Sequence, residues 1–153
     1  MGHVIVAKLA RVDHWRTQAY HRFLLDHART PFQWGVADCA TFAADGILAQ
    51  TGTDIASDFR GKYSDEAGAW AAIKTITGGT TVADAAAWCA VKHGMVELQH
   101  PLQAQRGDLV TVEDSGNEVA GLVHLNGRDV VVVGQHGLHR VPITKILRAW
   151  RVA

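Results

Sequence analysis

The 153-residue sequence has few cysteines and no excess of either charge. Its two cysteines, Cys39 and Cys89, are too few for a disulfide scaffold and form no Cys-x-x-Cys pair of the kind structural zinc sites use. Fifteen basic residues balance fifteen acidic ones, so nothing points to a nucleic-acid partner or an anionic membrane surface. The nine histidines are scattered without a His-Glu-x-x-His motif, and we expect no metal and no other cofactor.

Long hydrophobic runs are also missing. No segment approaches the ~18 consecutive apolar residues of a membrane span. The N-terminal segment MGHVIVAKLARVDHW lacks the basic start, the long apolar core and the small-residue cleavage site of a signal peptide. We therefore expect a protein made in a cytoplasm. With 48% hydrophobic and 20% charged residues, the composition predicts one folded domain over residues 1–153.

The sequence divides into a helical half, about residues 13–94, and a β half, about residues 106–152. In the first half, apolar residues recur at helical spacing between N-cap residues and glycines. The four expected helices cover residues 14–28 after Asp13, Asp38 to Gly52, Ser64 to Gly78, and Thr81 to Gly94, with Pro31 ending the first. The polar segment 53–65 connects the second and third helices, with Phe59 and Tyr63 as expected buried anchors.

The second half consists of short β-branched segments separated by turn sequences. The expected strands are GDLVTVE, EVAGLVHL, DVVVVGQ, GLHRVPI and RAWRVA, and the turns are DSGN, NGRD and GQHG. Asn126-Gly127 is the strongest hairpin signal. Helices followed by strands predict an α+β domain whose N-terminal helices pack on one face of a C-terminal antiparallel sheet. We expect that sheet to be a small curled meander, close to a half-barrel.

The pair Asp38-Cys39 stands where the segment PFQWGVADCATF changes from an apolar turn to a helical pattern. With Asp38 as the N-cap, Cys39 is the first helical residue, where the positive end of the helix favours a thiolate. The neighbouring carboxylate opposes this effect, because it disfavours a second anion. Cys39 is therefore either a nucleophile or a small buried residue at a helix start. Cys89, in an alanine-rich helical segment, is expected to be a core residue.

The order of these motifs resembles the NlpC-type, papain-like cysteine peptidases of bacterial cell-wall turnover. The shared pieces are Trp34-Gly35, Asp38-Cys39, Gly107-Asp108-Leu109-Val110 and the closing segment ILRAWRV. Residues 31–65, with QRGDLV and RAWRV, are similar to a narrower group of small NlpC-like proteins. That group is encoded among the tail-tip genes of long-tailed phages, prophages and gene-transfer agents. The resemblance implies a papain-like NlpC fold, with Cys39 as the nucleophile and Asp38 as the cap that orients its helix.

The resemblance is incomplete at the position of the catalytic base. A papain-like site needs a histidine beside the thiol and a third polar residue that orients this histidine. When the family pattern is anchored on Gly121 and on Asn126-Gly127, the histidine position corresponds to Val119 and the orienting position to Val131. Both expected partners of Cys39 are therefore replaced by apolar residues.

Two histidines in the β half, His124 and His136, are the weak candidates for a replacement base. His124 is an odd number of positions from Val119, so strand alternation places it on the opposite face unless a bulge intervenes. His136 falls in a turn after the next strand. Other histidines that tertiary folding could bring to Cys39 are His14, His21, His27 and His139, each otherwise expected at the surface.

The resemblance implies two functions. The first is a phage or phage-like tail-tip component with a degenerate cysteine peptidase domain. It would be located in the virion, assembled in the host cytoplasm, and in contact with hub and distal tail proteins and with peptidoglycan. The second is an active peptidoglycan cysteine endopeptidase that assists cell-wall penetration during DNA entry. A host-encoded amidase or acyltransferase is a third class. The five tryptophans are interface anchors or core residues, and we expect Trp34 and Trp150 in the core.

Overall fold

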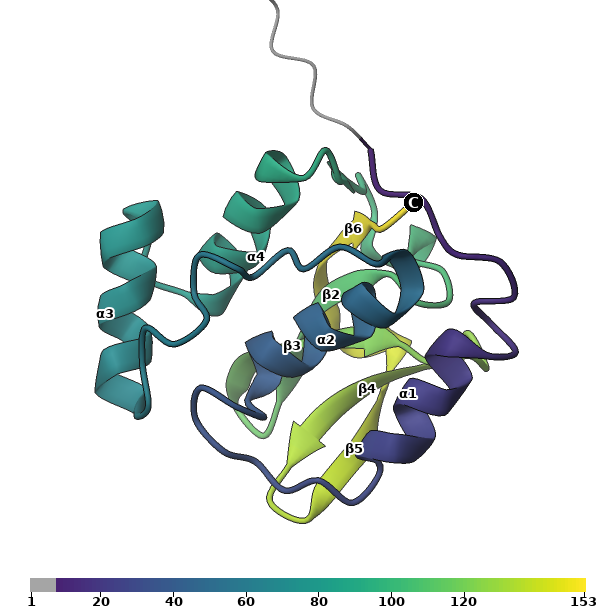
Figure 1. Ribbon diagram of the computed structural model, residues 1–153, viewed down its shortest axis with the longest axis horizontal. Coiled ribbons are helices and arrows are strands. Elements are labelled where there is room, and N and C mark those ends of the chain that lie inside the picture. The colour runs from purple at the N-terminus through teal and green to yellow at the C-terminus, as the bar shows by residue number, and fades with distance from the viewer. Residues whose placement is uncertain (1–7) are drawn as a thin grey trace, which may run out of the picture.

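Four helices and a six-stranded antiparallel sheet make up the computed structural model, which describes residues 8–153 (Figure 1). The helices are α1 (Ala19–His27), α2 (Cys39–Thr51), α3 (Glu66–Thr77) and α4 (Val82–Lys92). The strands are β1 (Val96–Glu97), β2 (Leu109–Asp114), β3 (Asn117–Val123), β4 (Asp129–Gly134), β5 (Gly137–Pro142) and β6 (Ile146–Arg151), with short 3-10 turns η1 (Pro101–Gln103) and η2 (Ile143–Lys145). The expected α+β class is confirmed.

The N-terminal segment was expected not to be a signal peptide. Its residues 1–7 lie outside the part of the chain that the structure describes. No helix within residues 8–153 has the length and hydrophobicity of a membrane span.

Helix starts follow the local capping chemistry. The Asp38 carboxylate accepts a hydrogen bond from the Thr41 N–H at 2.8 Å, and the Thr41 hydroxyl accepts one from the Asp38 N–H at 2.9 Å. This reciprocal capping box starts α2, and Gly52 ends it in the left-handed conformation. Thr81 starts α4 in the same way. α3 begins one residue later than expected, because the side chain of Asp65 caps it instead of Ser64.

The first helix is shorter than expected at both ends. α1 starts at Ala19 rather than residue 14, and no side chain caps it, so the role predicted for Asp13 is wrong. Residues 13–18 form turns in which His14 has a φ of +58°. Contacts with the end of α2 explain the difference: the Arg11 side chain donates a hydrogen bond to the Gln50 side chain at 2.9 Å, and the Val12 N–H donates one to the Gln50 carbonyl at 2.8 Å. The Trp15 ring packs beside Tyr20, and its centre lies 4.0 Å from the Arg11 guanidinium. The helix ends at His27, four residues before the proline expected to end it.

The sheet has the order β1-β6-β2-β3-β4-β5. The expected hairpins β2–β3, β3–β4 and β4–β5 are all present, but β6 does not continue the meander. It returns to pair with β2 on the other side, and the unexpected two-residue strand β1 pairs with β6. The sheet is therefore open, with β1 and β5 as its edges, and the expected curled half-barrel is corrected.

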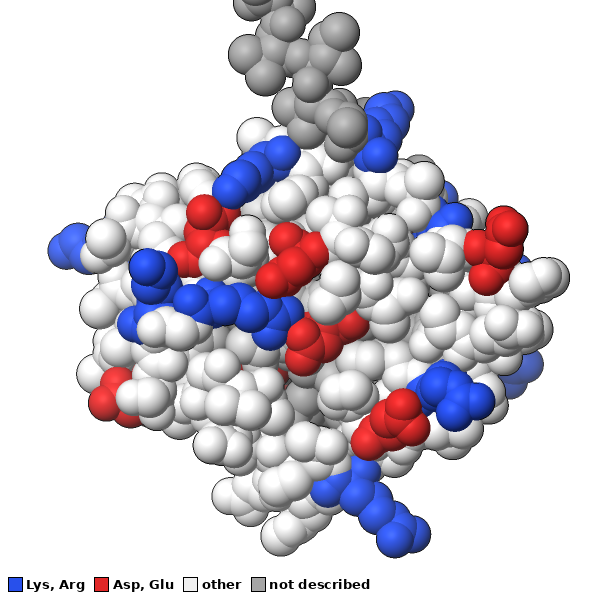
Figure 2. Space-filling model, viewed as in Figure 1, with Lys and Arg blue, Asp and Glu red and all other residues white. Residues whose placement is uncertain are grey.

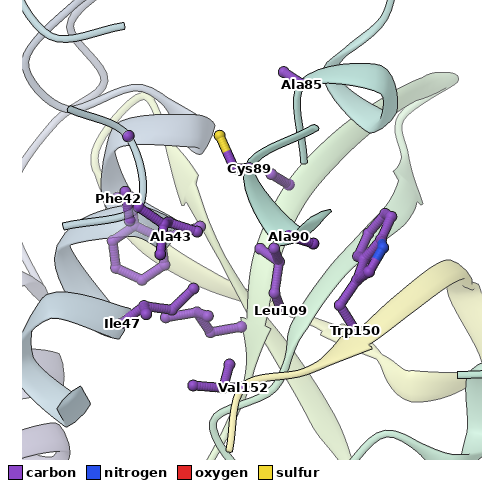
Figure 3. Packing of buried hydrophobic residues seen from close by; sticks show 14 of the residues in the cluster. Phe42, Ala43, Ile47, Ala85, Cys89, Ala90, Leu109, Trp150 and Val152 are labelled. Carbon is purple, nitrogen blue, oxygen red and sulfur yellow. The ribbon is translucent and has the colours of Figure 1, made fainter. Parts of the chain in front are cut away.

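Strand alternation gives the sheet two buried faces. One face packs against the helices, and Figure 3 shows Ile47 of α2 near Leu109 and Val152, with Trp150 on the far side of Leu109. The other face carries a second cluster of valines from β2, β3 and β4, with Leu98, Ala104 and Ile143 around it. Cys89 is 6% exposed in the first cluster, which confirms it as a core residue.

The Gly107-Asp108 motif joins distant parts of the chain to the start of β2. The Gln50 side chain at the end of α2 donates a hydrogen bond to the Gly107 carbonyl at 3.0 Å. Asp108 is fully buried and accepts a hydrogen bond from the Val152 N–H at 3.1 Å, while the Arg151 guanidinium lies 3.0 Å from the same carboxylate. Burial raises the pKa of Asp108, and these donors partly offset that effect. The motif fixes α2 and the C-terminal strand around β2.

Candidate functional site

The site is built around the N-terminus of α2, where Asp38 acts as a clamp for three segments. Its buried carboxylate accepts hydrogen bonds from the Gly35 N–H at 2.9 Å, from the Thr41 N–H at 2.8 Å and from the Tyr63 hydroxyl at 2.6 Å. Burial and the carboxylate together raise the pKa of Tyr63, which therefore stays a neutral donor. Asp38 is the helix cap that the sequence predicts. The sequence did not predict the hydrogen bond from Tyr63 to Asp38, because it indicated Tyr63 only as a buried anchor of the segment 53–65.

Cys39 follows the clamp as the first residue of α2, and its side chain is half-buried. Its sulfur lies beside the backbone of Ala120 on β3. Burial raises the pKa of the Cys39 thiol to about 11, and Asp38 adds to the rise. The backbone N–H groups near the sulfur act in the opposite direction but are the weaker influence. The helix-end effect that would favour a thiolate is thus outweighed, and Cys39 is a neutral thiol near pH 7.

A cavity of about 510 Å³ opens beside Cys39. Its walls come from α2, from the connector after it, from α3 and α4, and from β2 and β3. Figure 1 shows the α3–α4 pair set apart from α2, with the connector crossing between them. This volume is within the range of small-molecule binding sites, roughly 300–1,000 Å³.

Small side chains explain why this space is open. The surfaces of the three helices that border the cavity are rich in alanine: Ala40, Ala43 and Ala44 on α2, Ala69 on α3, and Ala85 and Ala86 on α4. An alanine surface cannot reach across to a neighbouring helix as leucine or phenylalanine would. Larger side chains stand elsewhere in the lining, notably Phe32, Trp34 and Trp70. Trp34 was expected in the core and instead lines the cavity, whereas Trp150 is buried as expected.

None of the eight histidines within residues 8–153 lines this cavity. His124 follows the end of β3, four residues beyond Ala120, which corresponds to roughly 13 Å of extended strand. Its ring instead accepts a hydrogen bond from the Asn126 N–H at 3.0 Å within the turn. His136 is exposed in the β4–β5 turn. Neither of the candidate bases is therefore among the groups that surround Cys39.

The remaining histidine candidates also lie away from the cavity lining. His14 and His21 are exposed, and His139 lies 2.9 Å from the Asp114 carboxylate. His27 packs against Phe23, with ring centroids 4.2 Å apart, and lines a separate cavity of about 290 Å³ together with Phe42.

Val119 and Val131 lie on opposite faces of the sheet. Val131 belongs to the helix-side cluster, whereas Val119 pairs across the strands with Val112 and packs with the second cluster. One catalytic site cannot draw side chains from both faces, so assigning both positions to the partners of Cys39 is corrected. On β3 the helix-facing positions beside the site are Glu118 and Ala120. Val119 also borders the cavity, between these two residues.

The arrangement presents a neutral thiol, a clamped carboxylate and an apolar cavity. Within the described part of the chain, no group of three or more histidine, cysteine or acidic residues is placed to hold a metal ion. The chemistry available at Cys39 without a neighbouring base is slow, because losing a general base costs typically ~10²–10⁴ in rate.

Comparison with known proteins gives one match. A family model described as a domain of unknown function, DUF6950, matches residues 10–152. No curated protein matches the chain. No solved structure matches it.

Proposed function

The chain belongs to the DUF6950 family, and we propose that it is a tail-tip component of a phage or phage-like particle with a degenerate NlpC-like cysteine peptidase domain. Its role is mainly structural, in tail assembly and in contact with the cell wall. Its partners are the hub and distal tail proteins, and it is located in the virion. The proposal rests on the order of the NlpC-like motifs and on the state of the site that they form.

The observation that carries the noncatalytic part is the surroundings of Cys39. The sulfur lies beside the backbone of Ala120, and no histidine of residues 8–153 is in the cavity lining. The pKa of about 11 keeps the thiol protonated near pH 7. A cysteine peptidase requires the opposite, a thiolate with an imidazole that accepts and returns the proton.

The structural part is supported by how the motifs are used. Asp38 and Asp108, from the two motifs of the resemblance, are buried and bonded to backbone groups. Both carboxylates therefore stabilise the fold whether or not any reaction occurs. A fold that such contacts stabilise can take part in tail assembly even when the domain has no catalytic activity.

The active endopeptidase remains the second candidate, favoured by Asp38-Cys39 at a helix start. Both candidates are tested by purifying tails from the producing host and introducing Cys39→Ser, which keeps the size and polarity of the side chain. We expect the protein in purified tails, and we expect the variant particles to assemble and infect as the wild type does. Purified protein incubated with peptidoglycan should release no more peptide than the Cys39→Ser protein.

Each measurement has an outcome that contradicts the proposal. Absence of the protein from purified tails would refute the tail-tip role. Peptide release from peptidoglycan that disappears in Cys39→Ser would instead establish the endopeptidase. A loss of infectivity in Cys39→Ser particles that assemble normally would show that the thiol has a function in entry.

A further inference from the structure

We propose that the cavity beside Cys39 binds a small ligand with an apolar body and a cationic end. This inference goes beyond the tail-tip role and does not depend on it. It rests on three properties of the cavity: its apolar walls, the charges in its lining, and the aromatic side chains near them.

The apolar body follows from the walls. The deep part of the lining consists of alanines from three helices together with aliphatic side chains such as Ile73, Val82 and Leu109. These groups offer no hydrogen bonds to a polar ligand, and an apolar ligand gains by leaving water. α3 packs mainly on α4 and little on α2, whereas α4 packs on β3 and β1, so the cavity lies between α2 and a helix pair that is fixed to the sheet.

The charge preference follows from the ion pairs. Arg60 is the one cation among the described residues that line the cavity. Its guanidinium is already bound by two carboxylates, donating to Asp45 at 2.6 Å and to Asp54 at 2.9 Å. An anionic ligand would therefore find no free cation in the lining. Figure 2 shows charges of both signs across the middle of this face.

Besides the clamped Asp38, two acidic side chains in the lining are not neutralised in this way. Glu66 and Glu118 form no ion pair with any residue of the described chain. Glu118 accepts a hydrogen bond from the Thr111 hydroxyl at 2.8 Å. It also helps to raise the pKa of Arg148, but that guanidinium is held by Glu97 at 2.7 Å. The lining thus keeps negative charge available for a ligand cation.

An aromatic side chain stands beside one of these carboxylates. The indole N–H of Trp70 lies 3.4 Å from the Glu66 carboxylate, and the side chain of Trp70 is 42% exposed. A carboxylate next to an exposed indole is a suitable environment for an ammonium group, because the ring face attracts cations as well. The same residues disfavour a carboxylate or phosphate end.

The test compares three ligands with the same eight-carbon chain: octyltrimethylammonium, octanol and octanoate. Isothermal titration calorimetry on the full chain measures each affinity. We expect octyltrimethylammonium to bind at least about tenfold more tightly than octanoate, with octanol between them. The double substitution Glu66→Gln with Glu118→Gln should remove most of this preference, because glutamine keeps the shape and the hydrogen bonds but not the charge.

The location is tested by filling the cavity. Ala86→Leu places a larger side chain in the lining, whereas Ala71→Leu makes the same change at an exposed position on α3. Ala86→Leu should weaken binding of all three ligands at least about tenfold, and Ala71→Leu should leave binding unchanged. If Ala86→Leu does not fold, as judged by circular dichroism, Ala86→Met tests the same space with a more flexible side chain.

Three results would overturn the proposal: no binding by any of the ligands, octanoate binding as tightly as the cation, or unchanged binding in the folded cavity-filling variant. The first would remove the site, the second its charge preference, and the third its location. None of these results would affect the tail-tip proposal, which is tested on particles.

Discussion

Alkylation of Cys39 by iodoacetamide tests the account of the site most directly. The perturbation is made in Cys89→Ala, so that Cys39 is the single reactive thiol in the sequence. Alanine suits this position, because Cys89 is buried in an alanine-rich helix and alanine introduces no polar group. We expect Cys39 to react more slowly than free cysteine at pH 7.

The magnitude follows from the pKa. A shift from the usual ~8.5 to about 11 lowers the thiolate fraction at pH 7 roughly 300-fold. A more basic thiolate is a better nucleophile. With a Brønsted coefficient of about 0.45, the reactivity of each thiolate rises roughly 13-fold over the same pKa difference. The net expectation is a rate roughly 20-fold below that of free cysteine, before any steric hindrance in the cavity.

The assay follows the alkylated mass over time between pH 7 and pH 10. The rate should rise about tenfold for each pH unit without levelling off, because a group titrating near 11 is still mostly protonated at pH 10. Free cysteine, measured in parallel, should begin to level off near its own pKa. A rate above that of free cysteine at pH 7, or a plateau below pH 8, would refute the reasoning and indicate an activated thiol.

Three stability predictions can be checked by urea unfolding. Asp38→Ala should lower the free energy of unfolding by about 2–4 kcal/mol, since it removes the helix cap and leaves buried donors unpaired. Tyr63→Phe removes one hydrogen bond to Asp38 and should cost only about 1 kcal/mol. Equal losses in the two variants would contradict the role of Asp38 as a clamp. Gly46→Ala should destabilise by about 1–3 kcal/mol, because its added methyl would stand 2.2 Å from Leu122 on β3, and a gain in stability would show that α2 can move away from the sheet there. Burial raises the pKa of Cys89 to about 12, so this thiol ionises in the unfolded chain before it does so in the folded one as the pH rises. The free energy of unfolding should therefore fall by about 2 kcal/mol between pH 8 and pH 10 because of Cys89. Cys89→Ala should remove this pH-dependent loss.

The sequence predicted those features that depend on a few neighbouring residues. Asp38 and Thr41 form their capping box three residues apart, and Gly52 ends the same helix, so the helix is encoded locally. The turn at Asn126-Gly127 and the β-branched strands on either side of it are local for the same reason. The α+β class followed from the order of these elements.

The sequence was wrong where distant segments override local preference. The turns before α1 are held by the end of α2, because the Arg11 side chain donates to the Gln50 side chain and the Val12 N–H donates to the Gln50 carbonyl. β6 pairs with β2 rather than with β5, the strand before it in the chain. Val119 and Val131 lie in different clusters, and no local signal specifies which face of β3 meets α2.

The sequence by itself determined that Asp38 caps a helix and that Cys39 is its first residue, because capping needs only hydrogen bonds between near neighbours. Only the tertiary structure decided what surrounds the thiol. It brings Tyr63 to Asp38 and the backbone of Ala120 to the sulfur, and it leaves an open cavity where alanines of three helices face one another. The pKa of Cys39 depends on burial and on charges from separate segments, so the packing of the whole domain, rather than the Asp-Cys pair, sets the chemistry of the site.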